Sequence, residues 1–181
     1  MAYFGPHITR ALELLTVGAG ETGYTIPLGH FRLPAGDLEA CESDAAERAV
    51  EVSIPSSAPL GGHQNPLVGR DLRTSPLLVR VAYRFHEEGT LDAGVDAADL
   101  GGADRASIEA RASEDAALIA VAVGWQPSWA DLTPVVVIDC APDPEGWALA
   151  DAPVNGRLLL TVPFTLTTRA AFPGSHGPAA S

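Results

Sequence analysis

Three glycines near the start of the sequence have a spacing that could bind a nucleotide. Gly18, Gly20 and Gly23 of GAGETG match the G-x-G-x-x-G pattern of dinucleotide-binding loops. Such a loop must follow a strand and open a helix, because the pyrophosphate binds the N–H groups of the helix N-terminus. Here a helical pattern precedes the glycines, and YTIPLGHFRLPAG, rich in proline and glycine, follows them. The sequence therefore predicts a turn-rich loop at 18–23 and no nucleotide cofactor.

The other residues that could do chemistry do not form a catalytic or metal-binding pattern. The five histidines are not spaced as helical metal ligands, and neither Cys41 nor Cys140 has a cysteine or histidine at ligand spacing. Glu87 and Glu88 are adjacent, so a strand would direct them to opposite faces. The acidic residues within 92–99 and 143–145 favour a solubilising role, with loop calcium binding as the alternative. We expect no catalytic, cofactor-binding or metal-binding residues, and hence no enzyme.

The composition is that of one globular domain with an acidic surface. The chain has 181 residues, 46% of them hydrophobic, and a formal net charge of −12, and every cation is an arginine. Such a charge argues against reading a nucleic acid, whose backbone requires clustered cations. No run approaches the roughly 20 apolar residues that span a bilayer, and MAYFGPHITR lacks the pattern of a signal peptide. We expect synthesis in the cytoplasm and no membrane partner.

Two segments have the apolar spacing of helices. Between Pro6 and Gly18 apolar residues recur by threes and fours, which predicts a helix over 7–17 that ends at the glycine. The second helix is predicted over roughly 104–124, with Asp104 as its N-cap. Its second half is apolar almost all round, which predicts burial on two sides. Its core stripe comprises Ile108, Ala112, Ala116, Ile119 and Val123.

Four further segments have the alternation or the apolar content of strands. They are ERAVEVSI (47–54), SPLLVRVAYRFHEE (75–88), PVVVIDCA (134–141) and RLLLTVPFTLTTRA (157–170). Pro163 cannot donate to a strand ladder, which indicates an edge or a bulge. The order α-β-β-α-β-β predicts an α+β domain, with a mostly antiparallel four-stranded sheet and helices packed on one face.

The alternation also predicts a polar face on two of these strands. The side chains predicted to lie opposite the apolar residues are Arg80, Arg84, His86, Thr161, Thr165, Thr167 and Arg169.

Long segments between the predicted elements lack periodicity. Residues 18–46 and 55–74 are predicted to be loops, and 55–74 is rich in proline and glycine. A loop of about 20 residues is unusual inside a compact domain and is typically functional or mobile. We therefore expect one domain over 1–170 with two long loops, followed by a flexible tail at 171–181.

The order of these elements resembles that of the tail terminator proteins of long-tailed bacteriophages. The resemblance covers about residues 7–170, and its main carriers are ERAVEVSI, PLLVRVAYRF and RLLLTVPFTLTTR. It implies a homo-oligomeric ring, usually of six copies, that caps the finished tail tube, stops its polymerisation and meets the head–neck connector. It also implies a place in the neck of the virion, assembly in the host cytoplasm and no enzymatic activity.

Under this resemblance the residues of the polar face are candidates for a subunit interface or for the lumen of the ring. An acidic protein would suit DNA passing through the lumen, because the polyanion would meet few cations. A head-completion or tail-tube protein of the same particle is one alternative, and an unrelated small-molecule-binding or enzymatic α+β domain is another. The candidates for an arm that reaches the next subunit are Pro59, Gly62, Pro66, Arg70 and Arg73.

Overall fold

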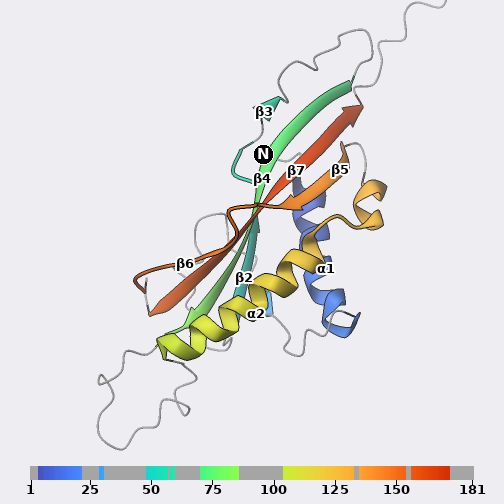
Figure 1. Ribbon diagram of the computed structural model, residues 1–181. Helices are drawn as coiled ribbons and strands as arrows, with labels where there is room; N and C mark the ends of the chain where they lie inside the picture. Colours follow the sequence, from blue (N-terminus) through green and yellow to red (C-terminus); the bar gives the residue numbers. More distant parts are fainter. Residues whose placement is uncertain are drawn as a thin grey trace, which may run out of the picture.

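Two helices lie on one side of a mostly antiparallel sheet (Figure 1). The computed structural model describes residues 4–21, 29–30, 48–56, 58–59, 70–85, 104–132, 135–153 and 156–171. The predicted α+β class and the order α-β-β-α-β-β are confirmed, and three two-residue strands are added. In chain order the elements are α1 (Gly5–Glu21), β1 (Gly29–His30), β2 (Arg48–Ser53), β3 (Ala58–Pro59), β4 (Arg70–Arg84), α2 (Arg105–Val123), the 3-10 helix η4 (Pro127–Asp131), β5 (Val135–Pro142), β6 (Ala148–Leu149) and β7 (Arg157–Ala171).

The sheet is built around the long pair β4 and β7. These two strands are antiparallel neighbours over their full length, from Arg70 opposite Ala171 to Arg84 opposite Arg157, and Figure 1 shows them as one twisted ribbon. The strand order is β1-β2-β4-β7-β5, with β3 beside β4 and β6 beside β7. Among the described strands, only the β1–β2 pair is parallel. Every other described strand therefore pairs directly with this ribbon except β1, which pairs with β2.

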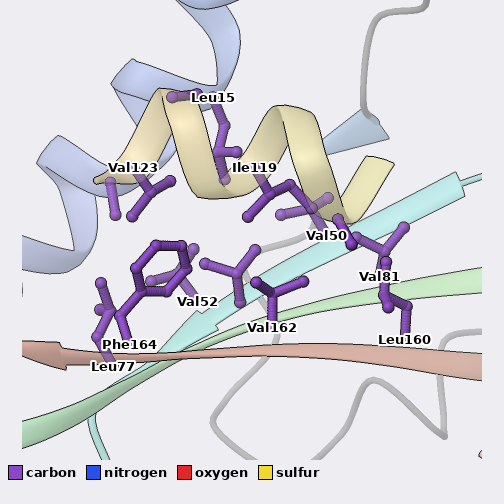
Figure 2. Close-up of a cluster of buried hydrophobic side chains, with 14 of the residues drawn as sticks. Leu15, Val50, Val52, Leu77, Val81, Ile119, Val123, Leu160, Val162 and Phe164 are labelled. Atoms are coloured by element: carbon purple, nitrogen blue, oxygen red, sulfur yellow. The ribbon is translucent and has the colours of Figure 1, made fainter. Parts of the chain in front are cut away.

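The hydrophobic core lies between the helices and the inner face of the sheet. Figure 2 shows Leu15 of α1 and Ile119 of α2 directed toward Val162 and its neighbours on the strands. The predicted apolar faces of β4 and β7 are confirmed, because alternate residues from Leu77 to Tyr83 and from Leu158 to Leu166 are buried. Burial of apolar surface at roughly 25 cal/mol per Å² makes this layer the main source of stability.

Helix α2 begins where the sequence predicts and packs by one face only. The Asp104 carboxylate accepts the N–H of Ser107 at 2.7 Å, and this bond lowers the pKa of Asp104. All five residues of the predicted stripe are buried. The predicted burial on two sides is wrong, because Val121 is 63% exposed. Small apolar side chains do not require burial, so composition alone could not assign the second face.

Helix α1 is longer than predicted. It continues through Gly18 and Gly20 to Glu21, so the predicted loop at 18–23 is wrong for its first four residues. A glycine costs about 1 kcal/mol relative to alanine inside a helix, which does not stop a helix anchored by the buried Ala11 and Leu15. The start of the glycine motif thus lies at a helix C-terminus, which presents carbonyl oxygens, whereas a pyrophosphate needs the opposite end.

Parts of the two predicted long loops are strands. The first loop, 18–46, contains β1 at 29–30. The second loop, 55–74, contains β3 and the start of β4, which include Pro59, Arg70 and Arg73. The loop prediction is therefore wrong for these three residues, because Pro59 pairs with Arg73 and Arg70 pairs with Ala171. Their role in an arm that reaches the next subunit stays a prediction. Gly62 and Pro66 lie outside the described residues. Ala171 of the predicted tail closes β7, and 172–181 also lie outside the described part.

Pro163 lies in an interior strand, which corrects the predicted edge or bulge in β7. Its carbonyl accepts the N–H of Asp143 at 2.9 Å, so this residue turns its backbone groups toward the side of β5 and β6. On that side β5 ends opposite Phe164 and β6 begins opposite Thr161. The missing N–H of proline therefore faces an interruption in the neighbouring ladder, where it is tolerated.

A buried histidine connects α1 to the start of β5. His7 is 2% exposed, and its Nε2 lies 3.1 Å from the carbonyl oxygen of Val135, to which it donates. Its Nδ1 has no hydrogen-bond partner among the described residues. Burial lowers the pKa of His7 below 6.5, against a smaller upward effect of the Val135 carbonyl. The imidazole is therefore held in its neutral form.

Acid should destabilise the protein through this histidine. Since its pKa is lower in the folded than in the unfolded chain, the unfolded chain takes up the proton first. The stabilising contribution is complete above pH 6.5 and is lost as the pH falls below 6.5 toward the folded pKa. We expect His7→Gln, whose amide can still donate to Val135, to flatten this part of the profile in urea unfolding followed by circular dichroism. Equal pH slopes would contradict the assignment, since both proteins share all other histidines.

Candidate functional site

The polar residues predicted on two separate strands meet on one face of the sheet. We call the face of β2, β4 and β7 opposite the helices the outer face. Arg80 of β4 lies directly opposite Thr161 of β7, and Arg84 lies opposite Arg157. His86 lies outside the described residues. The outer-face residues used below are Glu51, Leu78, Arg80, Arg84, Arg157, Leu159, Thr161, Pro163, Thr165, Thr167 and Arg169.

The outer face is partly accessible and mixes apolar with polar groups. Thr165 is exposed, and Arg84 and Arg169 are half-buried. Leu159 and Pro163 are also half-buried, so the polar stripe has an apolar border. No described helix covers this face, as Figure 1 shows for α1 and α2. A half-buried surface of this mixed type is suited to contact another protein.

An ion pair joins β2 and β4 on the outer face. An Nη of Arg80 lies 2.6 Å from a carboxylate oxygen of Glu51, and their side chains are 23% and 4% exposed. The register sets this contact, because Glu51 lies directly opposite Arg80. In the sequence Glu51 is a polar residue of a half-buried strand, yet the structure buries it. Its alternation with Val50 and Val52 carries no sign of burial, and only the pairing of β2 with β4 reveals the partner.

A further arginine was missed in the sequence. Arg157 is 6% exposed and lies opposite Arg84, so two guanidinium groups share one cross-strand position. An arginine at the start of a predicted strand is ordinarily solvated. Nothing in the sequence therefore singled out Arg157 as a candidate site residue. Like charges at such a position repel by a few tenths to about 1 kcal/mol. Both arginines also have other interaction partners in the structure, so neither is unpaired.

A second buried polar pair lies on the inner side of the sheet. The Tyr83 hydroxyl donates to a carboxylate oxygen of Asp115 at 2.6 Å, and the two residues are 2% and 4% exposed. The bond ties β4 to the middle of α2. Asp115 lies in the buried face of α2 beside Ala112 and Ala116, where an acid is unusual without a partner. The contact positions the helix on the sheet.

Among the residues that the structure describes, the other reactive side chains do not converge on a reaction centre. Burial raises the pKa of the Cys140 thiol to about 12, with a smaller effect of Asp139, so the nucleophilic thiolate is scarce at neutral pH. Within the described residues, no three histidine, cysteine, aspartate or glutamate side chains are grouped so as to hold a metal ion. None of the helices in the described part is long and apolar enough to cross a membrane.

Comparison with known proteins gives no family. No protein-family model matches the sequence, and no curated protein is significantly similar to it. The features of the molecule that bear on its function are the element order, the outer face and the charges described above.

Proposed function

We propose that the protein is a structural component of a long-tailed bacteriophage, a tail terminator that forms a ring on the tip of the tail tube. The observation that carries the proposal is the outer face of the sheet, because every described helix packs on the opposite face. Such a one-sided layer leaves a mixed polar and apolar surface for other subunits. The element order, on which the resemblance rests, supports the same assignment.

In this role the protein binds copies of itself, the tail tube protein and the head–neck connector. The resemblance to tail terminator proteins implies six copies in the ring. The ring resides in the neck of the virion and is assembled in the host cytoplasm. It needs no cofactor and carries out no reaction. DNA passes through the ring without sequence-specific contacts.

Imaging of the purified protein with and without tail tubes tests this function. Negative-stain electron microscopy, after mixing with extracts of cells that make tail tubes, should show discrete rings or tubes of uniform length capped at one end. Light scattering after size-exclusion chromatography should give a closed oligomer, since a ring is a closed assembly. Open-ended polymers would instead support a tail-tube protein. A monomer that leaves tube length unchanged would overturn the assignment in favour of an unrelated α+β domain.

A further inference from the structure

Strand β5 forms an edge of the described sheet. It is the last strand in the order β1-β2-β4-β7-β5, so among the described strands only β7 pairs with it. Its residues at 135–138, VVVI, are all β-branched, a type that favours strands. The edge of a strand presents backbone N–H and C=O groups with which a strand of another chain can pair. This edge therefore needs protection if copies of the protein are to stay apart.

The register shows which backbone groups of β5 face this edge. The carbonyl of Pro163 faces the side of β5, because it accepts the N–H of Asp143. The direction of the backbone groups alternates along a strand, so Arg169, six residues further on, faces β5 as well. Its ladder partner Val136 faces back toward β7. The preceding residue, Val135, therefore directs its carbonyl away from β7, toward the open edge.

The side chain of His7 covers the start of this edge. Its Nε2 donates to the outward carbonyl of Val135 at 3.1 Å, and the imidazole is buried. Phe4 packs edge-to-face against the imidazole, with the ring centroids 5.5 Å apart. A strand of another chain would need the same carbonyl as an acceptor. It therefore cannot pair with the start of β5 while α1 and His7 are in place.

Features further along β5 also oppose strand pairing. The register shifts between Val137 and Asp139, and this bulge interrupts the ladder. Asp139 is exposed, and Pro142 ends the strand without an N–H to donate. Bulges, charges and prolines commonly protect the edge strands of natural sheets. Between them Ile138 is 42% exposed, so an apolar side chain is still accessible at this edge.

We propose that His7 blocks the pairing of β5 with β5 of a second copy, and that loss of its bond to Val135 opens the edge to that copy. A second copy is suitable because it carries the same β-branched run, and two identical strands can pair antiparallel about a two-fold axis. The bulge and Asp139 weaken such a contact, whereas His7 occupies a backbone group that the contact needs. The block lies at an edge of the sheet and not on the outer face, so it does not rest on the proposed function.

Variants of His7 test the block by sedimentation velocity. We expect His7→Ala to associate beyond the wild-type assembly, about tenfold more tightly, since one recovered hydrogen bond contributes up to about that factor. His7→Gln still donates to Val135 and should behave as the wild type does. Adding Ile138→Glu to His7→Ala should reverse the association, because it places a second acid beside Asp139 on each copy and like charges on paired strands repel.

Hydrogen exchange followed by NMR locates the contact. Cys140 pairs with Leu166, which alternates with the β5-facing Thr165, so the amide of Cys140 is directed toward the open edge. In associated His7→Ala this amide should exchange more slowly than in the wild type. The same amide should not be slowed when Ile138→Glu is also present.

Leu15→Ala separates an open edge from a general loss of stability. Leu15 lies in the core on the same helix, so its truncation destabilises α1 but keeps the imidazole of His7. Equal association of Leu15→Ala would overturn the block. A folded His7→Ala that keeps the wild-type assembly, or an association that Ile138→Glu leaves unchanged, would also overturn it. If thermal unfolding shows that His7→Ala does not fold, His7→Leu takes its place with the same expected result, because leucine fills the site and lacks the donor.

Discussion

Trp129→Ala should lower the free energy of unfolding by about 3–5 kcal/mol. Trp129 is fully buried in the short helix η4 and belongs to the core cluster. Its indole N–H donates to the carbonyl of Val123 at 3.1 Å, one of the last carbonyls of α2, which has no partner within the helix. Alanine would therefore leave a cavity and also remove the hydrogen bond that satisfies the end of α2.

Urea unfolding monitored by far-ultraviolet circular dichroism gives this free energy without relying on tryptophan fluorescence. Trp129→Phe retains most of the apolar area and loses only the donor, so we expect it to cost roughly 1–2 kcal/mol. Trp125→Ala is the matched control, because Trp125 lies four residues away and is 44% exposed. Its effect should stay within roughly 0.5 kcal/mol. Equal losses for Trp125→Ala and Trp129→Ala would contradict the buried position of Trp129.

Tyr83→Phe should lower the free energy of unfolding by about 1.5–3 kcal/mol. The substitution keeps the ring in the core and removes the hydroxyl that donates to Asp115 at 2.6 Å. Because Asp115 is 4% exposed, water does not readily replace the lost donor. Asp115→Asn keeps an acceptor for the hydroxyl, and we expect it to cost less than Asp115→Ala.

A double-mutant cycle between Tyr83 and Asp115 isolates their contact. We expect a coupling free energy of roughly 1–3 kcal/mol from the variants Tyr83→Phe, Asp115→Ala and their combination. The same cycle between Tyr83 and Glu109, which is exposed on α2, should give a coupling near zero. A coupling near zero at Asp115 would show that the hydrogen bond does not hold α2 on the sheet.

The elements that the sequence predicted well are those whose periodicity continues without interruption. Alternation from Leu77 to Tyr83 and from Leu158 to Leu166 located the central strands and their inner faces. In α2 the Asp104 cap and the stripe from Ile108 to Val123 were also predicted, because a side-chain cap and an apolar stripe depend on local sequence. Together these signals were sufficient for the fold class.

The sequence failed where pairing between distant segments outweighs local preference. Residues 70–74 have no apolar alternation, yet they form the start of β4 because β7 and β3 lie beside them. Glu51 reads as a solvated residue until the register places it opposite Arg80. The polar residues of the outer face were predicted strand by strand, and their role at an interface or in a lumen stays a prediction. Their meeting on one surface required the β4–β7 register, which a single sequence does not contain.

The β4–β7 ribbon also constrains how the chain folds. Its partners, 70–84 and 157–171, are separated in sequence by α2, β5 and β6. Contacts of such high sequence separation close late, and domains dominated by them typically fold in milliseconds to seconds. During synthesis β4 can pair with β2, but its other edge stays open until β7 leaves the ribosome, and an open edge promotes aggregation. The yield of folded subunits should therefore depend on how soon β7 follows β4.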